Sequence, residues 1–203
     1  RTVVRDSLGV AIATGTYGLS FGAVAVTSGL DVAQTCALSL LMFTGASQFA
    51  LVGVLGSGGT PLAEALAALL LGTRNTLYGL RMAPLLGYRG WRRAAAAHVL
   101  IDESTAMAVT RPDRELARTG FLTTGATIFV LWNLTTLAGA VAGEQLGDLR
   151  DLGLDAAVGA AFLALLWPRL STPLLRAVAV LAALVAAGAV TVTPAGVPVL
   201  VAA

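Results

Sequence analysis

Hydrophilic side chains lie inside long apolar stretches of this sequence, where only a specific role or partner explains them. The first group falls within Met42–Phe49, where Thr44 and Gln48 are four residues apart and would share one helix face. Ser47 is adjacent to that face, and Gly45 thins the helix at the same level. An amide, two hydroxyls and a glycine could unwind the backbone and bind a zwitterionic ligand. The alternative is a hydrogen bond that only joins neighbouring helices.

A second group follows between positions 71 and 81. Arg74, Tyr78 and Arg81 are spaced i, i+4, i+7, which predicts one polar stripe on an otherwise apolar helix. Arg81 is near the predicted helix end, where its long side chain can reach water. Arg74 is in the middle of the helix, so its guanidinium could hold a substrate carboxylate through two hydrogen bonds or pair with a buried acid.

His98, Asp102 and Glu103 form the third group. His98 and Asp102 are four residues apart and could share a proton or a hydrogen bond. A histidine and two carboxylates in apolar surroundings suggest a proton relay. Only two metal ligands align, so no metal site is expected. The structural alternative is an ion pair between Asp102 and Arg74 on another helix.

The composition decides which solvent surrounds these groups. Hydrophobic residues make up 57% of the 203 residues and charged residues only 12%, with a mean hydropathy of +0.83. A soluble domain has about 25% charged residues, so this chain has too few polar side chains to cover a surface in water. Every basic residue is Arg, and the Arg cluster between apolar stretches, which is typical of membrane proteins and not of a nucleic-acid binder. The fold class expected is an all-α, polytopic transmembrane helical bundle.

A spanning helix needs about 20 mostly apolar residues, and this sets the expected spans. Candidates are Leu8–Leu30, Val32–Leu55, Pro61–Leu86, Ala94–Thr110, Gly120–Gly143, Ala156–Trp167, Leu174–Val192 and an incomplete Pro194–Ala203. Seven spans are expected if Ala94–Thr110 lies at the interface or enters part-way, and eight if it crosses.

The Arg residues give conflicting indications of orientation. The Arg residues at 111–118 and 169–176 indicate a cytoplasmic side, and the acidic link at 144–155 indicates an outer one. Arg5 agrees with a cytoplasmic N-terminus only if 94–110 crosses. The basic link at 88–93 would then lie outside, against the same rule.

The whole of 1–203 is expected to form one transmembrane domain, with both termini apparently trimmed. A hidden inverted repeat, common in transporters, remains open. Cys36 is the only cysteine, so no intrachain disulfide can form. No nucleophile–base pair beyond Cys36 and His98 and no phosphate-binding glycine loop is present, so neither an enzyme nor a bound cofactor is expected.

Four segments in order resemble the landmarks of the AzlC family: Phe21-Gly22, Thr44–Phe49, Arg74 with Leu77-Tyr78-Gly79, and Asp102-Glu103-Ser104. The resemblance implies the larger subunit of a bacterial exporter of leucine, isoleucine, valine and sometimes methionine in the cytoplasmic membrane. It further implies coupling to the proton gradient or membrane potential, and a small hydrophobic partner, AzlD. Where the family usually has Asn-x-Arg-His, this chain has Gly72-Thr73-Arg74-Asn75, which keeps only the Arg.

These indications lead to a hypothesis with assigned roles. Thr44, Gly45, Ser47 and Gln48 with the surrounding backbone, together with Arg74 and Tyr78, are expected to hold an amino-acid substrate. Asp102 and Glu103 are the expected proton carriers, and His98 modulates them. The alternative is a non-transporting membrane scaffold, in which Gln48, Arg74 and Asp102 serve stability alone.

Overall fold

The computed structural model describes residues 2–145, 163, 166–167, 170–193 and 197–198. The described residues form helices and no strand, which confirms the all-α transmembrane class. The expected spans Ala156–Trp167 and Pro194–Ala203 and the acidic link at 144–155 fall mostly outside the described residues.

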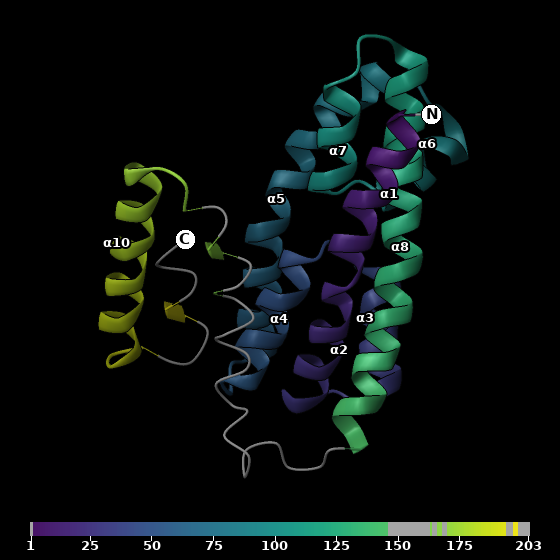
Figure 1. Ribbon diagram of the computed structural model, residues 1–203. Helices are drawn as coiled ribbons and strands as arrows, with labels where there is room; N and C mark the ends of the chain where they lie inside the picture. Colours follow the sequence, from purple (N-terminus) through teal and green to yellow (C-terminus); the bar gives the residue numbers. More distant parts are fainter. Residues whose placement is uncertain (1, 146–162, 164–165, 168–169, 194–196, 199–203) are drawn as a thin grey trace.

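Two long parallel helical segments form the centre of the bundle (Figure 1). Helices α1 (Thr2–Gly15) and α2 (Tyr17–Thr27) follow one another closely and together make an apolar span, and α8 (Arg114–Gln145) lies along them. Glycines set their spacing: a Cβ at Gly22 would strike the backbone of α8, and a Cβ at Gly139 would strike the carbonyl oxygen of Leu19. Close backbone approach of this kind is how helices pack in lipid.

The next segment enters the bundle and turns back. Helix α3 (Val32–Leu41) begins just after α2, and α4 (Ala46–Gly56) ends at the same place, where a Cβ on Gly56 would lie 2.8 Å from Ser28 Oγ. Each half has 10 or 11 residues, about half the length that a crossing requires. The prediction that Val32–Leu55 crosses as one span was therefore wrong. This segment is a helical hairpin (hairpin 1).

Helix α5 (Pro61–Leu86) then crosses to the other end of the bundle (Figure 1). The Thr60 hydroxyl caps its first turn by accepting from Ala63 N–H, and Pro61 is at its first position. At its far end the chain turns at Gly87, which has φ +64°. The last carbonyl oxygens of α5 accept hydrogen bonds from Arg side chains at the start of α8.

A second hairpin enters from that far end. It consists of α6 (Gly90–His98) and α7 (Asp102–Val109), joined by a bent segment at 99–101. Its direction is set by α8: a Cβ on Gly120 would lie 2.9 Å from the carbonyl oxygen of Met107, and one on Gly125 would lie 2.8 Å from that of Val99. Since α8 runs inward from Arg114, α7 must run outward. Ala94–Thr110 therefore enters the bundle part-way and does not cross it. We call the helical hairpin formed by α6 and α7 hairpin 2.

The two hairpins enter from opposite ends, so they are inverted relative to one another, and α5 lies between them in sequence. This arrangement brings the start of α1, the link at 88–93 and the segment 111–118 to one end of the bundle, the basic end (Figure 1). Asp31 and Glu64 lie at the other end. The Arg residues at 88–93 and at 111–118 no longer give conflicting orientations, because hairpin 2 between them returns the chain to the end at which it entered. The positive-inside rule then predicts that the basic end is cytoplasmic.

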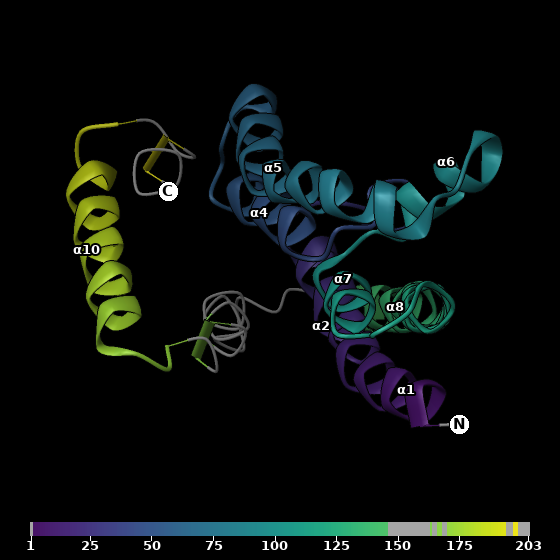
Figure 2. The ribbon, with the colours of Figure 1, turned by 90° about the horizontal axis from the view of Figure 1, so that it is seen from above.

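Helix α10 (Pro173–Val190) stands to one side of the other helices in Figure 2, and none of its residues is buried. Its 18 residues are long and apolar enough to cross a membrane, as expected for Leu174–Val192.

Candidate functional site

The tip of hairpin 1 is built around Gln48, whose side chain is fully buried. Its Oε1 accepts a hydrogen bond from Gly45 N–H at 3.1 Å, and its Nε2 donates to the carbonyl oxygen of Leu38 at 3.3 Å. A break between two half-helices leaves backbone groups without helical partners, and in lipid such groups must be satisfied by protein. Gln48 satisfies the N–H of Gly45 and also bonds to the Leu38 carbonyl oxygen, which already accepts from Met42 N–H at 2.9 Å, so it ties the two half-helices together.

Gly45 makes the turn itself. Its φ of +64° and ψ of −87° belong to a backbone region that residues with a Cβ rarely adopt. Thr44 lies before this turn and Gln48 after it, so the prediction that they share one helix face was wrong. The Thr44 hydroxyl instead donates to the carbonyl oxygen of Met42 at 3.4 Å.

Ser47 is in the first turn of α4, facing the middle of α5. It is 2% exposed, and its hydroxyl has no partner among the described residues. A Cβ on Gly72 of α5 would lie 3.6 Å from Ser47 Oγ, so Gly72 leaves room beside it. The positive end of the α4 helix dipole therefore lies inside the bundle, next to a free hydroxyl, which is a favourable place for an anionic group.

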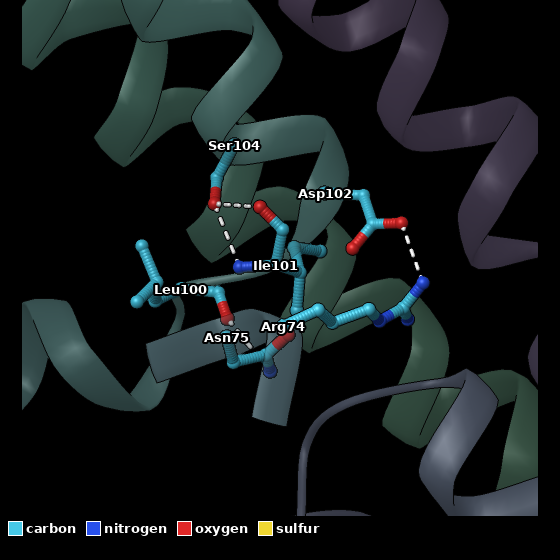
Figure 3. Close-up of polar contacts among 6 residues, drawn as sticks. All are labelled: Arg74, Asn75, Leu100, Ile101, Asp102 and Ser104. Carbon is cyan, nitrogen blue, oxygen red and sulfur yellow. Dashed lines mark hydrogen bonds and ion pairs between the residues drawn. The ribbon is translucent and has the colours of Figure 1, made fainter. Parts of the chain in front are cut away.

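Arg74 and Asp102 form an ion pair with 2.9 Å between Nη1 and Oδ2 (Figure 3). Their side chains are 29% and 21% exposed, so both are substantially removed from solvent. The structural alternative of an Arg74–Asp102 pair is thus present. Arg74 Nε is buried without a partner among the described residues. Part of the guanidinium's donor capacity is therefore unused.

Asn75 and Ser104 fix the bent segment of hairpin 2. Asn75 Nδ2 donates to the carbonyl oxygen of Leu100 at 3.4 Å. Ser104 Oγ accepts from Ile101 N–H at 3.0 Å (Figure 3). It also donates to the carbonyl oxygen of Val99 at 2.9 Å. Sequence reasoning missed these positioning roles, although Asn75 directly follows Arg74 and Ser104 belongs to one of the segments that resemble the AzlC landmarks.

His98 joins the two hairpin tips. Its Nε2–H donates to the carbonyl oxygen of Leu40 at 2.9 Å, so the C-terminal end of α6 touches that of α3. His98 and Asp102 were expected to share a proton or a hydrogen bond because they are four residues apart, but the bend at 99–101 puts them on different helices, so this helical spacing does not apply. Glu103 is next to Asp102 in the first turn of α7, where the helix dipole favours negative charge.

The stripe predicted on α5 is confirmed as helical. Tyr78 is half-buried one turn beyond Arg74, and Arg81 is exposed in the last turns, as expected of a side chain that reaches water. Among the described residues, no three His, Cys, Asp or Glu side chains group closely enough to hold a metal ion.

A cavity of about 500 Å³ lies between α5, α6 and α8. Its walls are mainly apolar and include Met82, Leu86 and Phe121. It extends from Asn75 and Leu100, which bond to each other next to the ion pair, to Tyr88 and Arg93 at the basic end. The cavity therefore connects the middle of the bundle with that end.

Aromatic rings fill the space behind hairpin 1. Phe21, Phe49 and Trp132 are almost fully buried, with ring centroids 5.4 to 6.3 Å apart. Phe21 and Phe49 are within the segments that resemble the AzlC landmarks, and Trp132 was not singled out in the sequence. The cluster supports the tip against α2 and α8.

Comparison with known proteins agrees with a membrane protein. A membrane protein of Helicobacter pylori (strain 26695), described as uncharacterized, is 31% identical over 90 residues, covering 44% of this chain and 40% of the relative. A second uncharacterized membrane protein, from strain J99, is 26% identical over 130 residues, covering 63% and 57%. The chain thus spans about half the length of these relatives. No solved structure matches.

The family model described as AzlC protein matches residues 9–146, which is more than half of the chain and includes both hairpins. Every residue assigned above to the hairpin tips and to the middle of α5 lies within the match. The chain belongs to the AzlC family of membrane proteins.

Proposed function

We propose that this protein is the larger subunit of a secondary transporter that exports branched-chain amino acids across the bacterial cytoplasmic membrane. The observation that carries the proposal is that two inverted hairpin tips meet through His98 and Leu40, while the Arg74–Asp102 pair joins α5 to the start of α7. Opposed half-helices inside a membrane protein present helix ends to a ligand, and transporters use such ends to bind charged groups. We therefore propose that the protein transports its substrate and does not catalyse a reaction on it.

The tip of hairpin 1 suits the charged end of an amino acid. The N-terminal end of α4 and the free Ser47 hydroxyl would receive the carboxylate, and Gln48 would keep the tip in position. The C-terminal ends of α3 and α6, which meet at His98, present carbonyl oxygens that attract an ammonium group. Thr44 and Tyr78 would border the bound molecule.

The ion pair supplies a way to couple substrate to protons. While Asp102 is ionised, it holds Arg74. Protonation of Asp102 would release the guanidinium, which could then bind the substrate carboxylate through two hydrogen bonds. Glu103 in the same turn is a second proton acceptor, and His98 would modulate both. Protonation of Asp102 and binding of the substrate carboxylate would therefore be linked at one guanidinium.

The cavity accounts for an apolar substrate. Its volume of about 500 Å³ is within the usual range for small-molecule pockets, and its apolar walls match leucine, isoleucine or valine side chains. Such walls discriminate by only about 1–3 kcal/mol per methylene, so several related amino acids, including methionine, should be accepted. With the basic end cytoplasmic, the cavity is the entrance for export.

A small hydrophobic AzlD-like subunit is the proposed partner. The family membership supports this, and α10 has a completely unburied apolar surface in the single chain. Transport by the whole protein is therefore to be assayed with the partner present.

The test is efflux of labelled leucine from proteoliposomes that contain both subunits, under an imposed proton gradient. Leucine should leave, valine and isoleucine should compete, and lysine should not. No flux under any gradient would defeat the proposal. The exchanged variant Arg74→Asp with Asp102→Arg separates transport from a scaffold role. A purely structural pair can be reversed without loss of flux, whereas a directional site should lose flux.

A further inference from the structure

Three hydroxyl groups where hairpin 2 meets α1 and α8 have no hydrogen-bond partner among the described residues. They belong to Ser7 of α1, Thr105 of α7 and Thr124 of α8. Ser7 and Thr124 are fully buried, and Thr105 is 9% exposed. A buried hydroxyl without a hydrogen bond is destabilising, and the cost is greatest where no water can reach it. Three such groups in one region therefore need an explanation.

Contacts along the helices place the three in one layer. On the outer side, a Cβ on Gly120 of α8 would lie 2.9 Å from the Met107 carbonyl oxygen and 3.5 Å from Val3 Cγ1. Ser7 is one helical turn further from the basic end than Val3, and Thr124 is one turn further than Gly120. Thr105 is also further from the basic end than Met107, because α7 runs toward that end.

On the inner side, one turn further on, Ala11, Ile101 and Ile128 belong to a single apolar cluster. The hydroxyl layer is thus bounded by apolar contacts on both sides. Nothing among the described residues bonds directly to these three oxygens. A small polar molecule that touches all three would satisfy them together.

The charge of the surroundings indicates which molecule. The carboxylates nearest in sequence are Asp6, Asp102 and Glu103. Asp6 pairs with Arg111 at 3.5 Å, and Asp102 pairs with Arg74 at 2.9 Å. The layer itself offers only neutral hydroxyl oxygens as ligands. Water, which both donates and accepts hydrogen bonds as hydroxyls do, fits the ligand set.

We propose that Ser7, Thr105 and Thr124 hold buried water and carry protons between Asp102 and the basic end. Asp102 and Glu103 begin α7, and Thr105 follows them within the same turn. At the other end, Asp6 precedes Ser7 and has a side chain that is 47% exposed, so it reaches solvent. A proton released by Asp102 would pass along the water and hydroxyls to Asp6. This route rests on the proposed function, in which Asp102 is the proton carrier.

Isosteric substitution tests the route. Thr124→Val and Thr105→Val remove a hydroxyl at nearly constant volume, and Thr136→Val is the matched control. Thr136 is also fully buried on α8, but its hydroxyl bonds directly to Ser39 at 3.4 Å and it lies away from the route. In proteoliposomes, proton-driven leucine flux should fall at least 10-fold in Thr124→Val and Thr105→Val. Leucine–leucine exchange, which needs no net proton movement, should stay unchanged. The control should retain both activities.

Thermal unfolding in detergent tests the water independently of transport. If the hydroxyls share water, Thr124→Val loses hydrogen bonds and the Tm falls. If they are dry and unpaired, the same change removes a destabilising group and the Tm rises, which would overturn the proposal. Unchanged proton-driven flux, or an equal loss of exchange, would also overturn it. Absence of leucine flux in the unsubstituted protein would instead defeat the proposed function and, with it, the proton route. The Tm measurement would then still show whether the three hydroxyls hold buried water.

Discussion

The carbonyl oxygen of Leu40 accepts a hydrogen bond from His98 Nε2–H at 2.9 Å, across 58 positions of sequence. This contact joins the ends of α3 and α6, two half-helices that enter the bundle from opposite ends. It defines the depth at which the hairpins meet. Substitutions around it should separate residues that shape the tips from residues that bind or carry protons.

Loss of the tip contact should affect transport more than folding. His98 is exposed in the single chain, so His98→Ala should lower the Tm only slightly. A neutral hydrogen bond contributes about 0.5–1.5 kcal/mol, so flux should fall about 2- to 10-fold if the contact stabilises the working arrangement. His98→Gln retains an N–H donor and should recover part of the flux. Equal flux in all three proteins would show that the contact has no role.

The Arg74–Asp102 pair should show strong coupling. Arg74→Ala or Asp102→Ala leaves one charge unpaired inside the bundle and should destabilise the fold by about 3 kcal/mol. The double substitution should cost less than the sum of the two, because neither charge then remains. Chemical unfolding of all four proteins in a double-mutant cycle measures this coupling. Additive losses would mean that the pair contributes nothing to stability.

Gly45 should be irreplaceable for conformational reasons alone. A Cβ at Gly45 would meet only Trp132 Cη2, at 3.9 Å, so there is space for it. Its φ of +64° and ψ of −87° are nevertheless strained for alanine, and Gly45→Ala should cost about 1–3 kcal/mol. The Tm and the leucine flux should both fall. Gly9→Ala is the control, since Gly9 is helical with open space around it.

Gly139 tests the packing of α8 against α1 and α2. A Cβ there meets the carbonyl oxygen of Leu19, and a backbone atom cannot move aside as a side-chain end can. Gly139→Ala should destabilise the protein by about 1–3 kcal/mol. At the open position, Gly9→Ala should stabilise the helix by up to about 1 kcal/mol. Similar Tm values for the two variants would contradict the close crossing.

Accessibility labelling tests the hairpins directly. In a Cys36→Ala background, Arg89→Cys and Pro112→Cys should react with an impermeant thiol reagent from the same side, because hairpin 2 returns. Gly58→Cys, at the other end, should react only from the opposite side. If Arg89→Cys and Pro112→Cys reacted from opposite sides, 94–110 would cross the membrane.

Part of the site was readable in the sequence. Charged and amide side chains in apolar stretches identified Gln48, Arg74 and Asp102, because burial in a membrane bundle is costly unless such groups have partners. The unusual segment around Gly45 correctly indicated unwound backbone. The possible Arg74–Asp102 pair was also named in advance, since a mid-helix guanidinium requires an anion.

Local patterns could not reveal the hairpins. Val32–Leu55 has the length and apolarity of one crossing, and hydropathy is the same for one long helix and for two half-helices that reverse. The bend at 99–101 contains Val, Leu and Ile, with neither Gly nor Pro to mark it. That bend is held by Asn75 and Ser104, whose hydrogen bonds form only when the elements are assembled.

The sequence alone therefore determined that lipid surrounds the protein, that the fold is helical and which polar groups lie in apolar stretches. These properties depend on composition and on the free energy of transferring side chains to lipid. The tertiary structure decided direction: which segments cross, which return and which ends meet. Contacts such as Gly56 with Ser28 and Gly125 with Val99 fix those directions, and they join residues that no local pattern relates.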